Sequence, residues 1–466
     1  MGIFPMMRES YDVVIVGAGP AGVFAALELA RGGCADVALL EKGPALDKRS
    51  CPARQADCVG CATCSVTTGF GGAGAFSDGK LTLTPEIGGW LADHIGRDAL
   101  VDAIRYVDSI WLEHGADPHV NRPDPAAVAA IEADARKAGL RLIPMPIRHI
   151  GTDHAPEVLG SMRRALEQAG VEIFTGAEVS RILVEDGALE GVELADGRRV
   201  RARFVVVAPG REGADWLADE ASALGIPLKH NAVDIGVRVE VPASVTERLT
   251  SVLYEAKLLF RAPTFDDEVR TFCMNPHGEV TTESYGDVVT VNGHSYAERQ
   301  TENTNFAVLV SQSFTHPFRE PLTYGHSISR LANLLGENIL VQRLGDLEAG
   351  RRSTPERIAQ GAIRPTLPSA TPGDLSFVLP YRHMTDIIEF VHAMDSLAPG
   401  VASPDTLLYG VEVKFYSSRI ETGPDLQTRI AGLYAIGDGA GVTRGLVQSS
   451  ASGVVAARSI IRRLTA

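Results

Sequence analysis

The order of apolar and polar positions near the start of the chain predicts a strand, a turn, a helix and a second strand. Residues 11–16 are a short β-branched run, which is typical of a buried parallel strand. They lead into a glycine-rich turn at 17–22, and residues 23–30 are good helix formers. A second apolar run, residues 37–40, closes on Glu41. The pattern therefore predicts a βαβ unit.

Residues 88–170 have a helical pattern, and we interpret them as an insertion. Asp124 is the expected N-cap of one helix, with Pro125 in its first turn and Gly139 as its C-cap. Short strands separated by Asp-Gly turns follow over residues 171–208. They predict a single strand and then a β-meander.

Residues 226–404 contain more aromatic residues and prolines and several short strands, so we interpret them as a separate substrate domain, or cap. The last residues return to the first pattern, with a strand, a Gly-rich turn and a terminal helix. The predicted fold class is α/β. A discontinuous Rossmann-type domain with a β-meander spans residues 1–225 and 405–466, and a second, α+β domain lies between its two parts.

Composition limits the partners of this chain. The formal charge is −14 over 466 residues, and no basic run interrupts the acidic bias, which disfavours nucleic acid and anionic lipid. Residues 13–30 are apolar, but their glycines and proline fall where a strand, turn and helix need them rather than a membrane span. The start lacks a signal-peptide pattern, so we expect a cytoplasmic protein.

The glycines at 17, 19 and 22 form a dinucleotide fingerprint in its proper context. Gly17 permits a tight turn, Gly19 lets the backbone approach a pyrophosphate, and Gly22 lets the helix pack on the strand. Glu41 follows at the end of the second strand, where its carboxylate can accept both ribose hydroxyls. These features address an adenosine ribose and a pyrophosphate, so we expect FAD rather than FMN.

Three later segments match the same kind of protein: residues 205–210, 433–438 and 445–449. With them the sequence resembles the flavin-dependent disulfide-reductase superfamily in its broad sense, the glutathione-reductase-like flavoproteins with a discontinuous FAD domain. Pro209 departs from that pattern. The resemblance implies that Asp438 binds the ribityl chain or a pyrophosphate-bound water. It also implies that residues 445–449 bring a helix N-terminus to the pyrimidine end of the flavin.

The resemblance narrows at residues 68–80, 275–279 and 351–353 and at Cys51-Pro52. There the chain is similar to a largely uncharacterised family of bacterial and archaeal FAD-dependent dehydrogenases, also described as NAD(P)/FAD-dependent oxidoreductases. The similarity covers nearly the whole chain and implies fold and cofactor, but no substrate. The expected FAD-binding residues are Gly17, Ala18, Gly19, Pro20, Ala21, Gly22, Glu41, Lys42, Gly72, Gly74, Ser77, Gly79, Val179, Ala208, Gly210, Gly437, Asp438, Gly445, Leu446, Val447 and Gln448.

The glycine string from Gly69 to Gly79 suits a backbone that lies flat against a planar ligand, and we expect it to touch the isoalloxazine ring. A mobile linker is the alternative, although Phe70 and Phe76 are unusual in a linker. The sequence holds one dinucleotide fingerprint, so NAD(P)H is expected only as a transient donor. Electrons could instead come from an electron-transfer protein or from the substrate.

Four cysteines precede this loop: Cys51, Cys58, Cys61 and Cys64. Their spacing is similar to iron–sulfur ligation in reversed order, and a 4Fe–4S cluster is the favoured interpretation. Structural zinc and free or redox-active thiols are the alternatives.

Candidate catalytic residues lie on a strand of alternating character. Glu412, Lys414 and Tyr416 share one face, which either lines the flavin pocket or is exposed to solvent. His294, after an expected turn at Asn292-Gly293, and Arg352 are further candidates for proton donation and carboxylate binding.

The expected function is FAD-dependent transfer of a hydride or electron pair to or from a small organic substrate, by dehydrogenation or double-bond reduction. A flavin-dependent monooxygenase and a non-catalytic flavin or thiol redox sensor are the alternatives.

Overall fold

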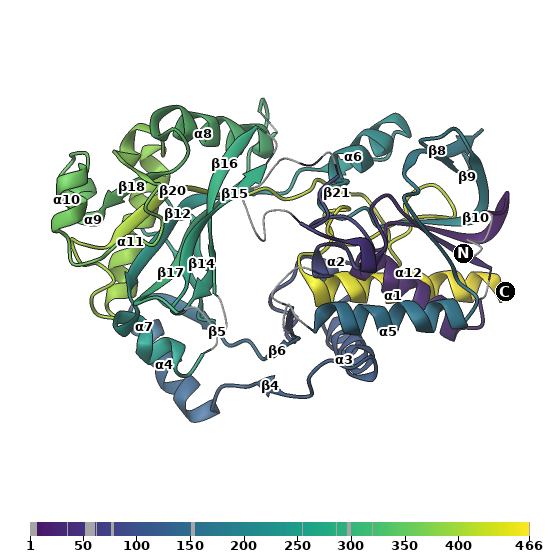
Figure 1. Cartoon of the computed structure of the whole chain (residues 1–466), viewed down its shortest axis with the longest axis horizontal. Coiled ribbons are helices and arrows are strands. Elements are labelled where there is room, and N and C mark those ends of the chain that lie inside the picture. The colour runs from purple at the N-terminus through teal and green to yellow at the C-terminus, as the bar shows by residue number, and fades with distance from the viewer. Residues whose placement is uncertain are drawn as a thin grey trace. The chain divides into compact units, whose positions relative to one another are not determined.

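A computed structural model describes residues 7–34, 36–51, 61, 63–75, 79–150, 154–253, 255–285, 287–295, 300–318 and 320–465. The chain divides into two compact units (Figure 1). Unit 1 comprises residues 1–121, 146–231 and 417–466. Unit 2 comprises residues 122–145 and 232–416.

Unit 1 contains a sheet in the order β7-β2-β1-β10-β9-β8, with β22 paired to β10. Strands β7, β2, β1, β10 and β22 are parallel to their neighbours, whereas β8 and β9 form an antiparallel extension of β10. The strands are β1 (Ser10–Val16), β2 (Val37–Glu41), β7 (Glu172–Thr175), β8 (Val179–Glu185), β9 (Ala188–Leu194), β10 (Arg199–Val207) and β22 (Leu433–Ala435). This is a Rossmann-type sheet with the predicted meander.

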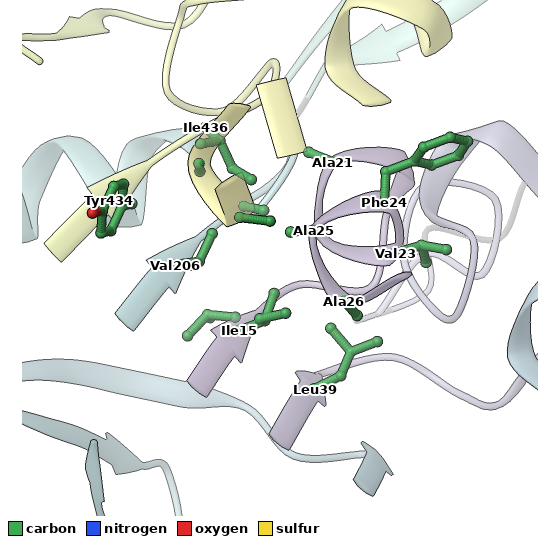
Figure 2. Close-up of a cluster of buried hydrophobic side chains, with 14 of the residues drawn as sticks. Ile15, Ala21, Val23, Phe24, Ala25, Ala26, Leu39, Val206, Tyr434 and Ile436 are labelled. Carbon is green, nitrogen blue, oxygen red and sulfur yellow. The ribbon is translucent and has the colours of Figure 1, made fainter. Parts of the chain in front are cut away.

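The sheet packs against α1 (Pro20–Arg31) because both elements present apolar side chains to each other. Figure 2 shows Ile15, Leu39 and Val206 of the strands directed toward the α1 residues Ala25 and Ala26. All five side chains are fully buried. Burial of this apolar surface is the main favourable contribution to the stability of the unit.

The C-terminal helix α12 (Leu446–Leu464) lies beside α1 (Figure 1). The two helices approach closely at Gly453, where a Cβ atom would lie 2.1 Å from the carbonyl oxygen of Ala21. This contact joins the last part of the chain to the first part. The remaining elements of unit 1 are η1 (Leu46–Lys48), η3 (Gly72–Ala75), β3 (Lys80–Thr82), α2 (Leu91–Ile95), α3 (Arg97–Glu113), β4 (Val120–Asn121), β6 (Ile147–His149), α5 (Ala155–Gln168), α6 (Ala214–Ala223), β11 (Leu228–Lys229) and β21 (Arg419–Ile420).

Unit 2 contains a larger sheet in the order β19-β18-β20-β12-β17-β14-β13-β5. Its strands are β5 (Leu140–Ile143), β12 (Val233–Pro242), β13 (Lys257–Arg261), β14 (Glu268–Asn275), β17 (Asn303–Gln312), β18 (Leu340–Arg343), β19 (Thr371–Pro372) and β20 (Leu407–Lys414), and β15 (Glu279–Tyr285) and β16 (Val288–His294) form a separate hairpin. The helices are α4 (Pro125–Lys137), α7 (Ala243–Thr250), α8 (Pro321–Gly336), α9 (Leu344–Glu348), α10 (Pro355–Gln360) and α11 (Tyr381–Asp395), with a 3₁₀ turn, η4 (Leu375–Phe377).

The central strand β12 shows how the two faces of this sheet differ. Ile235, Val237 and Val239 belong to an apolar core that also includes Phe390 of α11. The alternate positions Asp234, Gly236, Arg238 and Glu240 are also buried. The second face is therefore polar but closed to solvent.

The observed α/β fold with a second, α+β domain confirms the predicted fold class. The expected domain boundaries need correction. Residues 122–145 were expected in the helical insertion, but β5 pairs with β13 and belongs to unit 2. The second boundary lies at 416/417 rather than 404/405, because β20 pairs with β12 and β18.

Within the described part of the chain, the helices are too short or too polar for any of them to cross a bilayer.

Candidate functional site

In unit 1 the carboxyl ends of four parallel strands, β1, β2, β10 and β22, lie at one edge of the sheet. Each strand leads into a segment that the sequence assigned to cofactor binding. In open α/β sheets this edge is where ligands bind. The registers that join residues 13–16 to 204–207 and 205–207 to 433–435 bring these segments together although they are far apart in the sequence.

The three fingerprint glycines have different surroundings. At Gly17, φ is +99° and a Cβ would lie 2.2 Å from the carbonyl oxygen of Ala208. At Gly22, a Cβ would lie 1.9 Å from the carbonyl oxygen of Gly17. A Cβ at Gly19 would meet only the Cα of Gly72, at 3.9 Å. Gly17 and Gly22 are therefore required by the fold, whereas Gly19 keeps open the space before the N-terminus of α1.

Glu41 is buried, and its carboxylate is already hydrogen-bonded by the backbone. One oxygen accepts from Ala18 N at 2.9 Å, and the other accepts from Gly43 N at 2.8 Å and Gly69 N at 2.9 Å. Glu41 thus holds three loops together at the end of β2. A carboxylate offers about four acceptor positions, so little capacity remains for the predicted ribose hydrogen bonds.

The glycine-rich loop packs against protein. A Cβ at Gly72 would lie 2.9 Å from Gly19 Cα, and one at Gly74 would lie 2.9 Å from Leu446 Cδ2. Gly71 N also donates to the carbonyl of Ala18 at 2.8 Å. These glycines are therefore explained by close packing between the loop, the fingerprint turn and α12. The predicted contact with the isoalloxazine ring stays a prediction.

Sequence reasoning missed Arg49. Its guanidinium is buried and donates to the carbonyl oxygens of Ser65, Val66, Phe70 and Gly72 at 2.8–3.0 Å. Burial lowers the pKa of Arg49 to about 10, against the attraction of Glu41 and Cys64. Arg49 fixes the path of residues 65–72. A lone arginine in a loop carries no motif that would have revealed this role.

The C-terminal motif positions the start of α12. Asp438 accepts from Thr443 Oγ1 at 2.8 Å and from Gly445 N at 3.2 Å, and burial raises its pKa. Gly437 N donates to Ser452 Oγ at 3.1 Å. The first N–H groups of α12 therefore face the same edge of the sheet as the fingerprint turn, and a helix N-terminus favours anions.

Residues 87–90, here called the strap, cover the first turn of α12. Trp90 N donates to Val442 O at 2.8 Å, and Arg444 N donates to Gly88 O at 2.6 Å. The Trp90 ring lies under two guanidinium groups, those of Arg444 at 4.0 Å and Arg419 at 4.5 Å from its centroid. The sequence reasoning overlooked the strap, although the Gly-Gly pair before Trp90 is a signal for close backbone packing.

The other predicted cofactor residues are placed as follows. Ala208 and Gly210 follow β10, and Leu446 and Val447 begin α12, so they lie with the residues above. Lys42 forms an ion pair with Glu212. Val179 is buried at the start of β8, and Ser77 lies outside the described residues. Gly79 precedes β3.

These residues fit FAD. The open space at Gly19, the open space around a Cβ at Gly445 and the N-termini of α1 and α12 suit a pyrophosphate and a flavin. Gln448 is 2% exposed, yet its Oε1 has no hydrogen-bond partner among the described residues. Buried acceptors are rarely left without a donor, so this atom also indicates a ligand.

The cysteine quartet does not form a ligand set in the part of the chain that the structure describes. Cys51 is half-buried, Cys61 and Cys64 are exposed, and all three are free thiols. Cys58 lies outside the described residues. Among the described residues, no group of three His, Cys, Asp or Glu side chains could share a metal ion. The three described cysteines therefore do not fit an iron–sulfur cluster or zinc by themselves.

In unit 2, Glu412 lies in a buried ion-pair network. Both of its oxygens accept from Arg238, each at 2.8 Å, and both side chains are fully buried. Arg238 also donates to Asn305 Oδ1 at 2.8 Å. A solvent-exposed face, one of the two interpretations of this strand, is therefore wrong.

Lys414 and Tyr416 continue this face. Lys414 Nζ lies 3.1 Å from Glu283 and 3.3 Å from Glu412. Burial lowers the pKa of Lys414, but the two carboxylates outweigh it and the net shift is upward, so Lys414 stays charged. Tyr416 donates to Asp234 at 2.7 Å.

The other two catalytic candidates, unlike Glu412 and Lys414, are exposed. His294 is exposed at the end of β16, and Arg352 is exposed between α9 and α10. The turn expected at Asn292-Gly293 is absent from the hairpin, because both residues lie inside β16, where Gly293 packs on Arg238 and Asn305. Arg238 was missed. The alternation of Asp234, Arg238 and Glu240 with valine and isoleucine would have revealed it.

Two family models match this chain. Residues 12–231 match the model described as "FAD binding domain", and residues 232–415 match "FAD-dependent protein, C-terminal domain-like". Their shared boundary agrees with the boundary between the two units at 231/232.

Among similar proteins, an "Uncharacterized protein" of Clostridium beijerinckii is 28% identical over 97% of this chain and 80% of its own length. The tRNA uridine 5-carboxymethylaminomethyl modification enzyme MnmG of Caldicellulosiruptor saccharolyticus is 31% identical over 43% of this chain and 24% of its own length. Among solved structures, 3-ketosteroid-delta4-(5alpha)-dehydrogenase from Rhodococcus jostii aligns over 98% of both chains, with 15% identity and a TM-score of 0.44.

Proposed function

The chain is an FAD-dependent oxidoreductase, and on this premise we propose that it transfers a hydride or an electron pair between the flavin and a small organic substrate. FAD, when bound, accepts or donates a hydride at its N5 atom. The observation that carries the proposal is the convergence of the four parallel strand ends on the open space at Gly19 and the start of α12.

The residues of unit 1 hold the cofactor in this proposal. The N-termini of α1 and α12 stabilise the pyrophosphate and the negative charge of the reduced ring. Glu41 and Arg49 keep the surrounding loops in place through backbone hydrogen bonds. The finer resemblance to glutathione-reductase-like flavoproteins stays part of this proposal.

Lys414 is the proposed substrate-binding cation in unit 2. Its raised pKa makes it a poor general base at neutral pH and a good partner for a carboxylate or an enolate oxygen. Glu412 is held by two hydrogen bonds from Arg238, and it fixes the position of the Lys414 ammonium group. We therefore favour substrates that carry a carboxylate or a carbonyl group next to the bond that is oxidised or reduced.

The experiment is anaerobic titration of purified protein with small acids and carbonyl compounds while the flavin absorbance is recorded. Bleaching by a substrate, or reoxidation of reduced flavin by one, supports the proposal. Oxygen consumption coupled to hydroxylation would indicate a monooxygenase. Absence of any flavin reaction with substrates, with thiol oxidation instead, would favour a redox sensor.

The same purified protein serves to identify the electron donor and to measure the metal content. Reduction by NADH or NADPH tests a transient nicotinamide donor, and its absence favours a protein donor or the substrate itself. The iron–sulfur cluster stays a prediction that requires Cys58. Iron, sulfide and zinc per flavin, measured beside a Cys61→Ser variant, test it.

A further inference from the structure

The side-chain amide of Gln448 makes a hydrogen bond with its donor but not with its acceptor, among the described residues. Gln448 is the third residue of α12, and its Nε2 donates to the carbonyl of Ile87 at 3.0 Å. Its Oε1 has no partner among the described residues. A reversed amide would place two oxygen atoms against each other, so this orientation is the one that chemistry allows. Gln448 therefore holds a buried acceptor in one orientation, without a donor among the described residues.

The strap holds this acceptor in place. At Gly88, φ is +121°, and a Cβ would lie 2.9–3.0 Å from three atoms of the Gln448 side chain. The strap is fixed in turn by the Arg444–Gly88 and Trp90–Val442 backbone hydrogen bonds. Truncation of Gln448 would leave the strap without its contact, and a side chain at Gly88 would push Gln448 away. The contacts of the strap therefore hold the side-chain amide of Gln448 in one orientation.

The polar groups here match one edge of a flavin. The first N–H groups of a helix have no carbonyl partner within the helix, so α12 offers donors beside the acceptor of Gln448. The pyrimidine edge of oxidised flavin presents a carbonyl, an N–H and a second carbonyl. A pyrophosphate has no donor to offer, whereas a ribityl hydroxyl does.

We propose that Oε1 of Gln448 accepts a hydrogen bond from N3–H of the flavin and so selects the imide edge of the ring. This inference rests on the proposed function, because it requires bound FAD. Gln448 then orients the ring, and the strap orients Gln448.

The test uses full-length protein loaded with FAD that carries nitrogen-15 at N3. In the wild type, the N3–H proton should be observed by NMR and exchange slowly with water. In Gln448→Leu, which keeps the size but lacks the acceptor, exchange should be at least about tenfold faster and the Kd for FAD about tenfold higher. Ser450→Ala is the matched control, because Ser450 is buried in the same helix and its Oγ also lacks a partner among the described residues.

Unchanged N3–H exchange in Gln448→Leu with one FAD per chain would overturn the inference and indicate a ribityl contact. If Gln448→Leu binds no FAD, Gln448→Glu decides, because it keeps an acceptor at the same position. A protected N3–H there supports the inference, and an unprotected one refutes it. A wild-type chain that binds no FAD would instead refute the proposed function.

Discussion

Two clusters of buried charge, one in each unit, are stabilised in different ways. In unit 1, Glu41 accepts from three backbone N–H groups and Arg49 donates to backbone carbonyls. In unit 2, Arg238, Glu412 and Lys414 are joined through their side chains. The first cluster therefore fixes loop conformation, whereas the second fills the polar face of a sheet.

This difference predicts which substitutions should destabilise each cluster most. A side chain paired with backbone can be removed and water or local rearrangement can partly replace it, but a Cβ at a tightly packed glycine displaces the loop itself. A side chain paired with another buried charge leaves that charge behind when it is removed, at high cost. The loop cluster of unit 1 should thus be most sensitive at its glycines, and the cluster of unit 2 at its ion pairs.

The largest effect is expected from Glu412→Ala. It leaves Arg238 buried without a counter-charge, and loss of one partner of a buried pair costs about 3–5 kcal/mol. Chemical denaturation with a probe in unit 2 would measure this. The double variant Arg238→Met with Glu412→Leu should recover most of the loss, because it removes both charges.

Glu113→Ala is the matched control for this first prediction. Glu113 pairs with Arg31 at 2.6 Å, but its side chain is 60% exposed. Exposed pairs contribute about 0–1 kcal/mol. If Glu412→Ala and Glu113→Ala lose the same free energy of unfolding, the buried and the exposed ion pair do not differ in their contribution to stability.

A comparison of Gly17→Ala with Gly19→Val separates folding from binding in unit 1. Gly17→Ala should lower the stability of flavin-free protein by about 2–3 kcal/mol, since its Cβ would collide with Ala208. Gly19→Val should leave that stability nearly unchanged and abolish FAD binding, because its side chain enters the open space. Thermal unfolding with and without FAD measures both. Tight FAD binding by Gly19→Val would contradict the assigned pyrophosphate position.

Much of unit 1 could be predicted from the sequence because its determinants are local. The strand, the glycine turn and the helix adjoin each other, and the apolar pattern placed β1 and β2 within about one residue of their observed bounds. The transfer of residues 122–145 to unit 2 could not be predicted, because it depends on the pairing of β5 with β13, more than a hundred residues away.

The residues of the candidate site also divide into those with a local sequence signal and those without one. Gly17 and Gly22 were predicted correctly as tight positions, because a turn and a helix start require them. The polar face with Glu412 and Lys414 was recognised by alternation, but no local pattern pairs it with Arg238, which lies 174 residues away in the sequence. Arg49 and the strap act through backbone groups of distant segments, which leave little trace in side-chain patterns.

Lys414→Met should lower turnover at least about tenfold while FAD stays bound, a loss of about 1.4 kcal/mol. Lys257→Met is the matched control. Both lysines are buried and lie near the Phe272 ring, at 5.8 and 5.1 Å, but burial holds the pKa of Lys257 well below its ordinary range. A neutral Lys257 should matter less to an anionic substrate. Equal effects of the two variants on kcat, with flavin content unchanged, would refute the special role of Lys414.

The smallest net effect is expected from Asp386 and His383, two buried side chains of α11. Their titration changes the free energy of unfolding in opposite directions as the pH rises. Burial and the neighbouring Asp267 raise the pKa of Asp386 from 3.8 to about 7. Folded protein then keeps a proton that unfolded protein has lost, so this contribution to stability decreases as the pH rises from about 4 to about 7. Burial lowers the pKa of His383 from 6.5 to about 4, so its contribution increases from about pH 4 to about 6.5.

Because the two contributions nearly cancel, wild-type stability should change little between about pH 4 and pH 6.5 on account of this pair. Asp386→Asn removes the falling contribution, so its free energy of unfolding should rise with pH in that range. His383→Phe removes the rising contribution, and its free energy of unfolding should fall. Urea unfolding at several pH values, with a probe in unit 2, measures the sign of each slope. Parallel slopes in the two variants would show that at least one of these groups is not held neutral by burial, which would contradict this prediction.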